Sequence, residues 1–184
     1  MNFNTHSNLK GLHAFLGASK YHWINYDEQK LAESFTKFQA TQKGTELHEL
    51  AAKLITLGVK LPRSQKSLNN YVNDSIGYKM TPEQPLYFSD NCFGTADSIS
   101  FRNNFLRIFD LKTGVSATSI HQLEVYAALF CLEYDESPND IEIELRIYQS
   151  YEIEILLPYA EDILIIMNKI IQFDKHLNKL KSEE

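Results

Sequence analysis

The sequence predicts an α/β fold in which helices flank a β-sheet. Two segments, 88–112 and 141–157, alternate apolar and polar residues in the manner of half-buried strands. Helical spacing of apolar residues precedes the first segment, separates the two and follows the second. The chain order is therefore helices, a hairpin, a helix, a second hairpin and a helix, which is typical of mixed α/β layers.

The first helical segment runs from Asp27 to about Leu57. We expect a break near Gly44, because the apolar face changes there from Leu31, Phe35 and Phe38 to Leu47, Leu50, Leu54 and Leu57. Gly58 is a candidate C-cap, since glycine adopts left-handed backbone without strain. A further helix is expected over Ser64–Ile76.

The first hairpin is predicted from strands over Phe88–Phe101 and Phe105–Lys112, joined by a two-residue turn at Asn103-Asn104. A helix over Ser119–Tyr134 follows, with Leu123, Ala127 and Phe130 at core spacing.

The second hairpin pairs the strand that carries Ile141 to Ile147 with Tyr151–Leu157, through a three-residue loop of Tyr148, Gln149 and Ser150. This loop would place Arg146 opposite Glu152 and keep the apolar faces together. The alternating glutamates are expected on a solvated face: Glu142, Glu144, Glu152 and Glu154. A helix from Tyr159 to about Leu180 closes the chain.

Length and composition favour one domain over residues 1–184, with a helical part to about residue 80 and the sheet with its helices over about 84–180. The N-terminus is polar, and no apolar run of the chain is long enough to span a membrane. We therefore expect a cytoplasmic protein without a membrane partner. Cys92 and Cys131 are too few for a four-cysteine zinc site or an iron–sulfur cluster.

The apolar pattern of the first hairpin places two aspartates together. If Arg102 pairs with Phe105, the same register sets Asp97 opposite Asp110, and Lys112 follows on the same face. Directly opposed carboxylates repel each other, unless one has a raised pKa or both bind a divalent cation. A carboxylate pair with a neighbouring lysine is typical of sites that activate water for hydrolysis.

These residues fall within three ordered motifs: Gly94-Thr95-Ala96-Asp97, Ile108-Phe109-Asp110-Leu111-Lys112-Thr113-Gly114, and Gln122-Leu123-Glu124-Val125-Tyr126-Ala127. The set resembles the PD-(D/E)xK nuclease superfamily, and within it the RecB-like and phage-type exonuclease branch. Those proteins carry G-x-x-D, hydrophobic-D-x-K-T and Q-x-x-x-Y in this order. The resemblance covers about residues 44–127 and implies a restriction-endonuclease-like core with a mixed sheet flanked by helices.

The resemblance also implies a metal site. That branch has a histidine on an upstream helix, matched here by His48, which on sequence alone would be an exposed surface residue. His48, Asp97 and Asp110 would bind Mg²⁺ or Mn²⁺, with the backbone carbonyl of Leu111. Many relatives have glutamate where this chain has Asp110.

Further catalytic roles follow from the same resemblance. Lys112 would orient or deprotonate the attacking water, and Asp97 and Asp110 would act with it. Gln122 and Tyr126, four residues apart on one helix face, would contact the nucleophile or the scissile backbone. The implied reaction is phosphodiester hydrolysis by a stand-alone nuclease, with exonuclease favoured over endonuclease, in recombination, repair or phage DNA processing.

Charge is distributed unevenly, although the net charge is −6. Lys37 to Lys79 carries a net +4 and Glu133 to Asp162 a net −9. The basic region is expected to contact the DNA backbone with little sequence specificity, through Lys43, Lys53, Lys60, Arg63 and Lys66.

Alternatives stay open. The protein could be a catalytically inactive nuclease-fold protein that binds DNA or regulates, or a nuclease acting on RNA. Tyr21, Trp23 and Tyr26 could stack on bases or pack in a core. The phage-type resemblance makes a single-strand annealing protein a candidate partner. It is also compatible with an oligomer of this chain.

Overall fold

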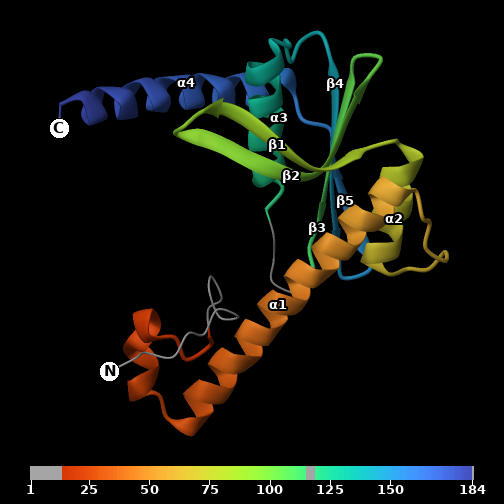
Figure 1. Ribbon diagram of the computed structural model, residues 1–184. Helices are drawn as coiled ribbons and strands as arrows, with labels where there is room; N and C mark the ends of the chain where they lie inside the picture. The colour runs from red at the N-terminus through yellow and green to blue at the C-terminus, as the bar shows by residue number, and fades with distance from the viewer. Residues whose placement is uncertain (1–13, 115–118, 184) are drawn as a thin grey trace, which may run out of the picture. The chain divides into compact units, whose positions relative to one another are not determined.

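The computed structural model describes residues 14–114 and 119–183. The chain divides into two compact units, Met1–Thr45 and Glu46–Glu184. Helix α1 (Glu28–Leu57) contains residues of both units and is continuous through Gly44 (Figure 1). The predicted helix break at Gly44 is therefore wrong, since one glycine costs a helix only about 1 kcal/mol. The expectation of a single domain stays a prediction.

In the first unit, a small aromatic cluster joins α1 to the segment that precedes it. The Phe15 ring lies 5.1 Å from the ring of Phe35 and 5.3 Å from that of Phe38. The 3₁₀ helix η2 (Ala18–Asn25) contains Trp23, whose indole N–H donates to the carbonyl of Gly17 at 3.0 Å. Of the aromatic residues considered for stacking, Tyr21 and Tyr26 are exposed.

The second unit begins with the end of α1 and with α2 (Ser67–Gly77). The predicted C-cap is confirmed: Gly58 has a φ of +67°, and the Val59 N–H donates to the Leu54 carbonyl at 2.9 Å.

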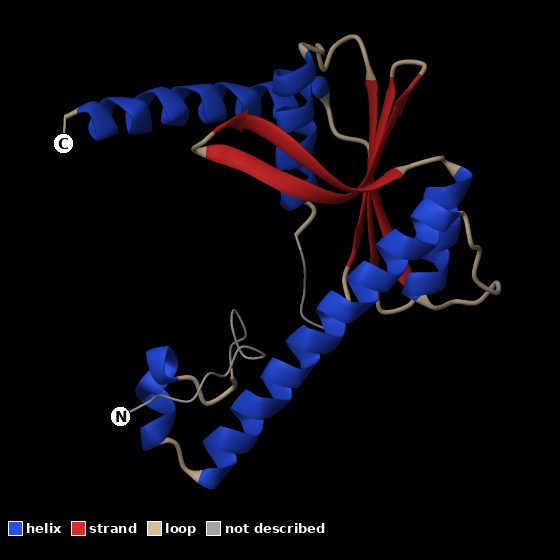
Figure 2. Cartoon of the chain, in the orientation of Figure 1, coloured by secondary structure: helices blue, strands red, loops and turns tan. Residues whose placement is uncertain are grey.

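Five strands form one mixed sheet in the order β1-β2-β3-β4-β5 (Figure 2). Helix α3 (His121–Tyr134) links β3 to β4, which pair in parallel, and the other neighbouring strands are antiparallel. The strands are β1 (Thr81–Ser89), β2 (Cys92–Arg102), β3 (Phe105–Leu111), β4 (Glu142–Gln149) and β5 (Glu152–Leu156). The predicted α/β class with a flanked mixed sheet is confirmed.

Apolar side chains cover both faces of this sheet. On one face, α3 and α4 (Ala160–Ser182) pack through residues such as Leu123, Ala127 and Ile163 against Leu106 and Ile108. On the other, Ala51 and Ile55 of α1 and Tyr71 and Val72 of α2 pack against Phe109. Successive side chains of β3 therefore pack into two hydrophobic cores, one on each face of the sheet, as expected of a strand at the centre of a layered fold.

The predicted strand Phe88–Phe101 begins too early, because two strands meet there: its part from Cys92 onward is confirmed as β2, and Phe88 and Ser89 belong to β1. Strand β1 ends at Ser89 and β2 begins at Cys92. Pro82 and Pro85 conceal β1 in the sequence, because proline lacks the N–H that a central strand donates. It is tolerated in β1 because this strand lies at the edge of the sheet.

The predicted loop of the second hairpin is also wrong. Ser150 and Tyr151 form a two-residue turn, both with positive φ, and Arg146 pairs with Ile155 instead of Glu152. This shift by an odd number of residues turns Ile153 and Ile155 to the face opposite Ile147. Arg146 is held by Asp74 and Glu144 at 3.2 and 3.0 Å.

Glu144 also departs from the expectation of a solvated face. Its side chain is largely buried and contacts both Arg107 and Arg146. Glu142, Glu152 and Glu154 are exposed as expected.

Candidate functional site

The first hairpin has the predicted register up to the point where β2 leaves β3. The ladder runs from Arg102 opposite Phe105 to Ser98 opposite Phe109. Beyond it, β1 and β2 curve away from the other strands (Figure 1). Asp97 does not complete a backbone pair with Asp110; its carboxylate accepts the Leu111 N–H at 2.9 Å. The side chain of Asp97 thus holds the strands together where their backbones part.

Helix α1 brings a histidine to this point. His48 Nδ1 lies 3.2 Å from Asp97 Oδ2. The interaction with Asp97 raises the pKa of His48, although burial acts in the opposite direction. His48 is thus a neighbour of Asp97, which the helical pattern alone did not predict, and its role as a metal ligand stays a prediction.

A third group, Glu83, lies beside these two. The β1–β2 register pairs Pro82 with Ser98 and Gln84 with Ala96, which places Glu83 across from Asp97. One ligand atom each of His48, Glu83 and Asp97 lies within 4.8 Å of the others. Glu83 also has a φ of +50°, a strained value for a residue with a Cβ. Glu83 was not predicted from the sequence because strand β1 was not predicted.

On β3, Asp110 forms an ion pair with Lys112. Lys112 Nζ lies 2.9 Å from Asp110 Oδ2 and 3.1 Å from Oδ1, and only the Oδ1 contact has hydrogen-bond geometry. Among the described residues, no donor satisfies the buried Oδ2 atom. Asp110 is 3% exposed. Burial raises its pKa, the charge of Asp97 raises it further, and Lys112 opposes both effects.

Helix α3 completes the site with two polar side chains. Lys112 Nζ donates to Gln122 Oε1 at 3.1 Å, and Gln122 Nε2 donates to the Tyr126 hydroxyl at 3.3 Å. Tyr126 also lies against Gly94 on β2: a Cβ built on Gly94 would be 2.8 Å from Tyr126 Cε1. The structure therefore gives a physical reason for glycine at this position.

Three carboxylates and one histidine share this region, and their electrostatics favour a cation. Burial raises the pKa of Glu83, and so does the charge of Asp97. Carboxylates that raise each other's pKa values in this way can instead share a divalent cation. Oxygen and imidazole ligands of this kind suit Mg²⁺ or Mn²⁺.

The predicted residues are therefore brought together with one addition. His48, Asp97, Asp110, Lys112, Gln122 and Tyr126 all belong to one region. Glu83, which was not predicted, groups its ligand atom with those of His48 and Asp97, whereas Asp110 lies outside this group, and its predicted role as a metal ligand stays a prediction. The backbone N–H of Leu111 contacts Asp97, and its predicted role as a carbonyl ligand stays a prediction.

The five predicted DNA-binding residues are all exposed, in different segments. Lys43 belongs to the first unit and Lys53 to the part of α1 in the second. Lys60, Arg63 and Lys66 lie in the loop between α1 and α2, and Lys66 is adjacent to the first residue of α2.

No protein-family model, curated protein or solved structure matches this chain. Within residues 14–114 and 119–183, no helix is sufficiently long and apolar to cross a membrane.

Proposed function

We propose that this protein is a metal-dependent deoxyribonuclease with a restriction-endonuclease-like core. The observation that carries the proposal is a continuous series of contacts across the sheet. It leads from His48 through Asp97 and the Leu111 backbone to Asp110, and from there through Lys112 and Gln122 to Tyr126. Residues from α1, β2, β3 and α3 would not meet in this way in an ordinary surface hairpin.

The topology supports the same proposal. Three antiparallel strands, a crossover helix and a fourth strand parallel to the third place the three motifs on β2, β3 and α3. The motif residues resemble those of PD-(D/E)xK nucleases in identity and order, and their side chains converge.

His48, Glu83 and Asp97 would hold the divalent cation. The charge of Asp110, which contributes to the raised pKa of His48, would add to the negative potential at this site. A bound Mg²⁺ or Mn²⁺ supplies a water with a lowered pKa and stabilises charge on a phosphate oxygen. Asp110 holds the Lys112 ammonium in place. Lys112 orients the attacking water and stabilises the negative charge that develops on the phosphate.

Gln122 and Tyr126 contact the nucleophile or the scissile backbone from α3. Their position next to Lys112 supports this role, since Gln122 accepts from Lys112 Nζ and donates to the Tyr126 hydroxyl. Contacts to DNA are made mainly to phosphates, through the exposed basic residues Lys43, Lys53, Lys60, Arg63 and Lys66. Affinity therefore falls steeply with salt and varies little with sequence. From the phage-type resemblance we propose exonuclease action and a single-strand annealing protein as partner. We also propose a cytoplasmic location.

The test is DNA cleavage by the purified full chain. Linear duplex and covalently closed circles are incubated with Mg²⁺, Mn²⁺ or EDTA, using wild type, Lys112→Ala and Asp110→Ala. Cleavage of linear DNA that requires metal and is lost in both variants is expected. Cleavage in EDTA would refute the proposal, as would full activity of Lys112→Ala. Clean DNA binding without cleavage in any metal favours an inactive nuclease fold that binds DNA.

A further inference from the structure

A pocket of about 340 Å³ opens next to Lys112, on the side of the α2 N-terminus. This volume is within the range of about 300–1,000 Å³ that accommodates a small organic molecule. Its lining includes Leu47, Lys66, Ser67, Leu68, Lys112 and Tyr151. We call it the Lys66 pocket.

The chemistry of the Lys66 pocket suits a nucleotide. Lys66 supplies a positive charge, Lys112, whose ammonium pairs with Asp110, also lines the pocket, and none of the described lining residues is acidic. Lys66 is also the N-cap of α2, whose first turn carries no acidic residue, so the helix dipole adds to the positive potential. Leucine side chains and the ring of Tyr151 provide apolar surface for a base.

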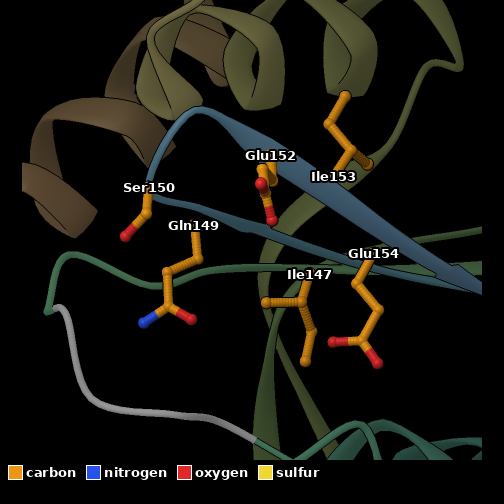
Figure 3. Close-up of a pocket in the computed structure, with 6 residues that line it drawn as sticks. All are labelled: Ile147, Gln149, Ser150, Glu152, Ile153 and Glu154. Carbon is orange, nitrogen blue, oxygen red and sulfur yellow. The ribbon is translucent and has the colours of Figure 1, made fainter.

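A second pocket, on another part of the β4–β5 hairpin, provides a contrast. It has about 370 Å³ and is lined by Ile147, Gln149, Ser150, Glu152, Ile153 and Glu154 (Figure 3). Its two glutamates would repel a phosphate, so of these two pockets the Lys66 pocket is the better suited to a nucleotide.

Tyr151 occupies a backbone position that disfavours it. It is the second residue of the Ser150-Tyr151 turn and has a φ of +71°. Such turns favour Asn-Gly, since side chains are strained at positive φ. The Tyr151 side chain is 70% exposed, so core packing gives no reason for tyrosine here. Strained residues concentrate at functional sites.

Two hydrogen bonds fix this turn against the walls of the pocket. The Tyr151 N–H donates to Ser67 Oγ at 3.0 Å, and Gln149 Nε2 donates to the Gly114 carbonyl at 2.6 Å. The ring of Tyr151 is therefore presented from backbone that is tied to α2 and to the segment after Lys112. Such preorganisation lowers the entropic cost of binding.

The geometry points to a binding site for one unstacked nucleotide of single-stranded DNA in the Lys66 pocket, with its base on Tyr151 and its phosphate on Lys66. This inference depends on the proposed nuclease function for the identity of the polymer. A paired base cannot leave its stack without a cost in free energy. The site therefore gives the enzyme a preference for single-stranded DNA or frayed ends.

The test measures binding in EDTA, where cleavage does not interfere. Fluorescein-labelled (dT)12 and a 12-base-pair duplex are titrated by anisotropy into wild type, Tyr151→Gly and Tyr151→Trp. Tyr151→Gly should weaken (dT)12 binding about 5- to 150-fold, the range for loss of one stacked base. Its Tm should be unchanged or higher, because glycine relieves the strained φ. Tyr151→Trp should retain affinity for (dT)12. In the double variant Trp23→Phe, Tyr151→Trp, the tryptophan at position 151 is the only one in the sequence, and (dT)12 should quench its fluorescence.

Tyr159→Ala is the matched control, since Tyr159 is 79% exposed and lies outside the pocket. Lys66→Ala should weaken (dT)12 binding and reduce its salt dependence by about one ion, whereas Lys175→Ala should not. Unchanged (dT)12 affinity of Tyr151→Gly would overturn the inference even if the protein cleaves DNA. If (dT)12 quenches the fluorescence but the protein never cleaves DNA, the nucleotide site in the Lys66 pocket is supported and only the proposed nuclease function is refuted.

Discussion

Gly94 on β2 and Tyr126 on α3 approach so closely that a Cβ on Gly94 would lie 2.8 Å from Tyr126 Cε1. This contact fixes the tyrosine hydroxyl next to Gln122, which in turn contacts Lys112. Gly94→Ala should push the ring away and lower the rate of cleavage about tenfold, equivalent to roughly 1.4 kcal/mol of transition-state stabilisation. Gly77→Ala is the control, since a Cβ there meets no atom within 4 Å. Equal rates for both variants would show that the contact is dispensable.

Lys112→Ala removes the only cation that the described residues place on Asp110. We expect kcat to fall about 10²- to 10³-fold, as is usual when a group that stabilises negative charge in the transition state is lost. Lys112→Arg should recover little, because a planar guanidinium does not replace a compact ammonium. Steady-state cleavage with Mg²⁺ at varied DNA concentration measures kcat and KM, with Lys175→Ala, at an exposed lysine of α4, as control. A loss confined to KM would assign Lys112 to substrate binding.

Asp110→Asn should stabilise the metal-free protein while it abolishes activity. The pKa of Asp110 is raised in the folded state, so the folded protein binds a proton more tightly than the unfolded chain. Its ionised form therefore costs stability at every pH above that pKa, and the cost disappears as the pH falls below the unfolded value. In EDTA at pH 7 the Tm of Asp110→Asn should exceed that of wild type, by differential scanning calorimetry. A lower Tm would mean that the Lys112 ion pair outweighs burial.

Metal affinity should rise with pH through the titration of His48. Asp97 raises the pKa of His48 above its ordinary value, and a protonated imidazole cannot bind a metal, so binding must release this proton. Titration calorimetry with Mn²⁺ between pH 6 and 8, in buffers of different ionisation enthalpy, counts the released protons. His48→Gln should bind Mn²⁺ more weakly, and its Mn²⁺ affinity should not change with pH through the protonation of residue 48. A pH-independent affinity in wild type would exclude His48 from the ligand set.

The part of the site on β2, β3 and α3 was predictable from the sequence because local rules determine it. Asn103 and Asn104 both adopt positive φ, as the predicted turn requires. The alternation of apolar residues then sets the register down to Ser98 and Phe109. No such rule anticipates the point where the strands part and the Asp97 carboxylate replaces a ladder partner.

The errors have physical causes that single-residue patterns do not reveal. Glu83 was missed because prolines mask an edge strand, although they are tolerated there. The second hairpin was misaligned because Tyr151 takes a positive φ, which sequence statistics disfavour for tyrosine. The Tyr151 backbone N–H donates a hydrogen bond to the hydroxyl of Ser67, which lies on α2, more than 80 residues earlier in the sequence. Tertiary contacts of this kind are invisible to local reasoning.

Anomalous diffraction from crystals soaked in Mn²⁺ tests the central proposal most directly. We expect one strong peak, bounded by His48 Nδ1 or Nε2 and by carboxylate oxygens of Glu83 and Asp97, at about 2.0–2.3 Å from each ligand atom. The peak should vanish in Asp97→Asn crystals under the same soak. No peak among these three residues in wild type at saturating Mn²⁺ would contradict the proposed metal centre and the nuclease that depends on it.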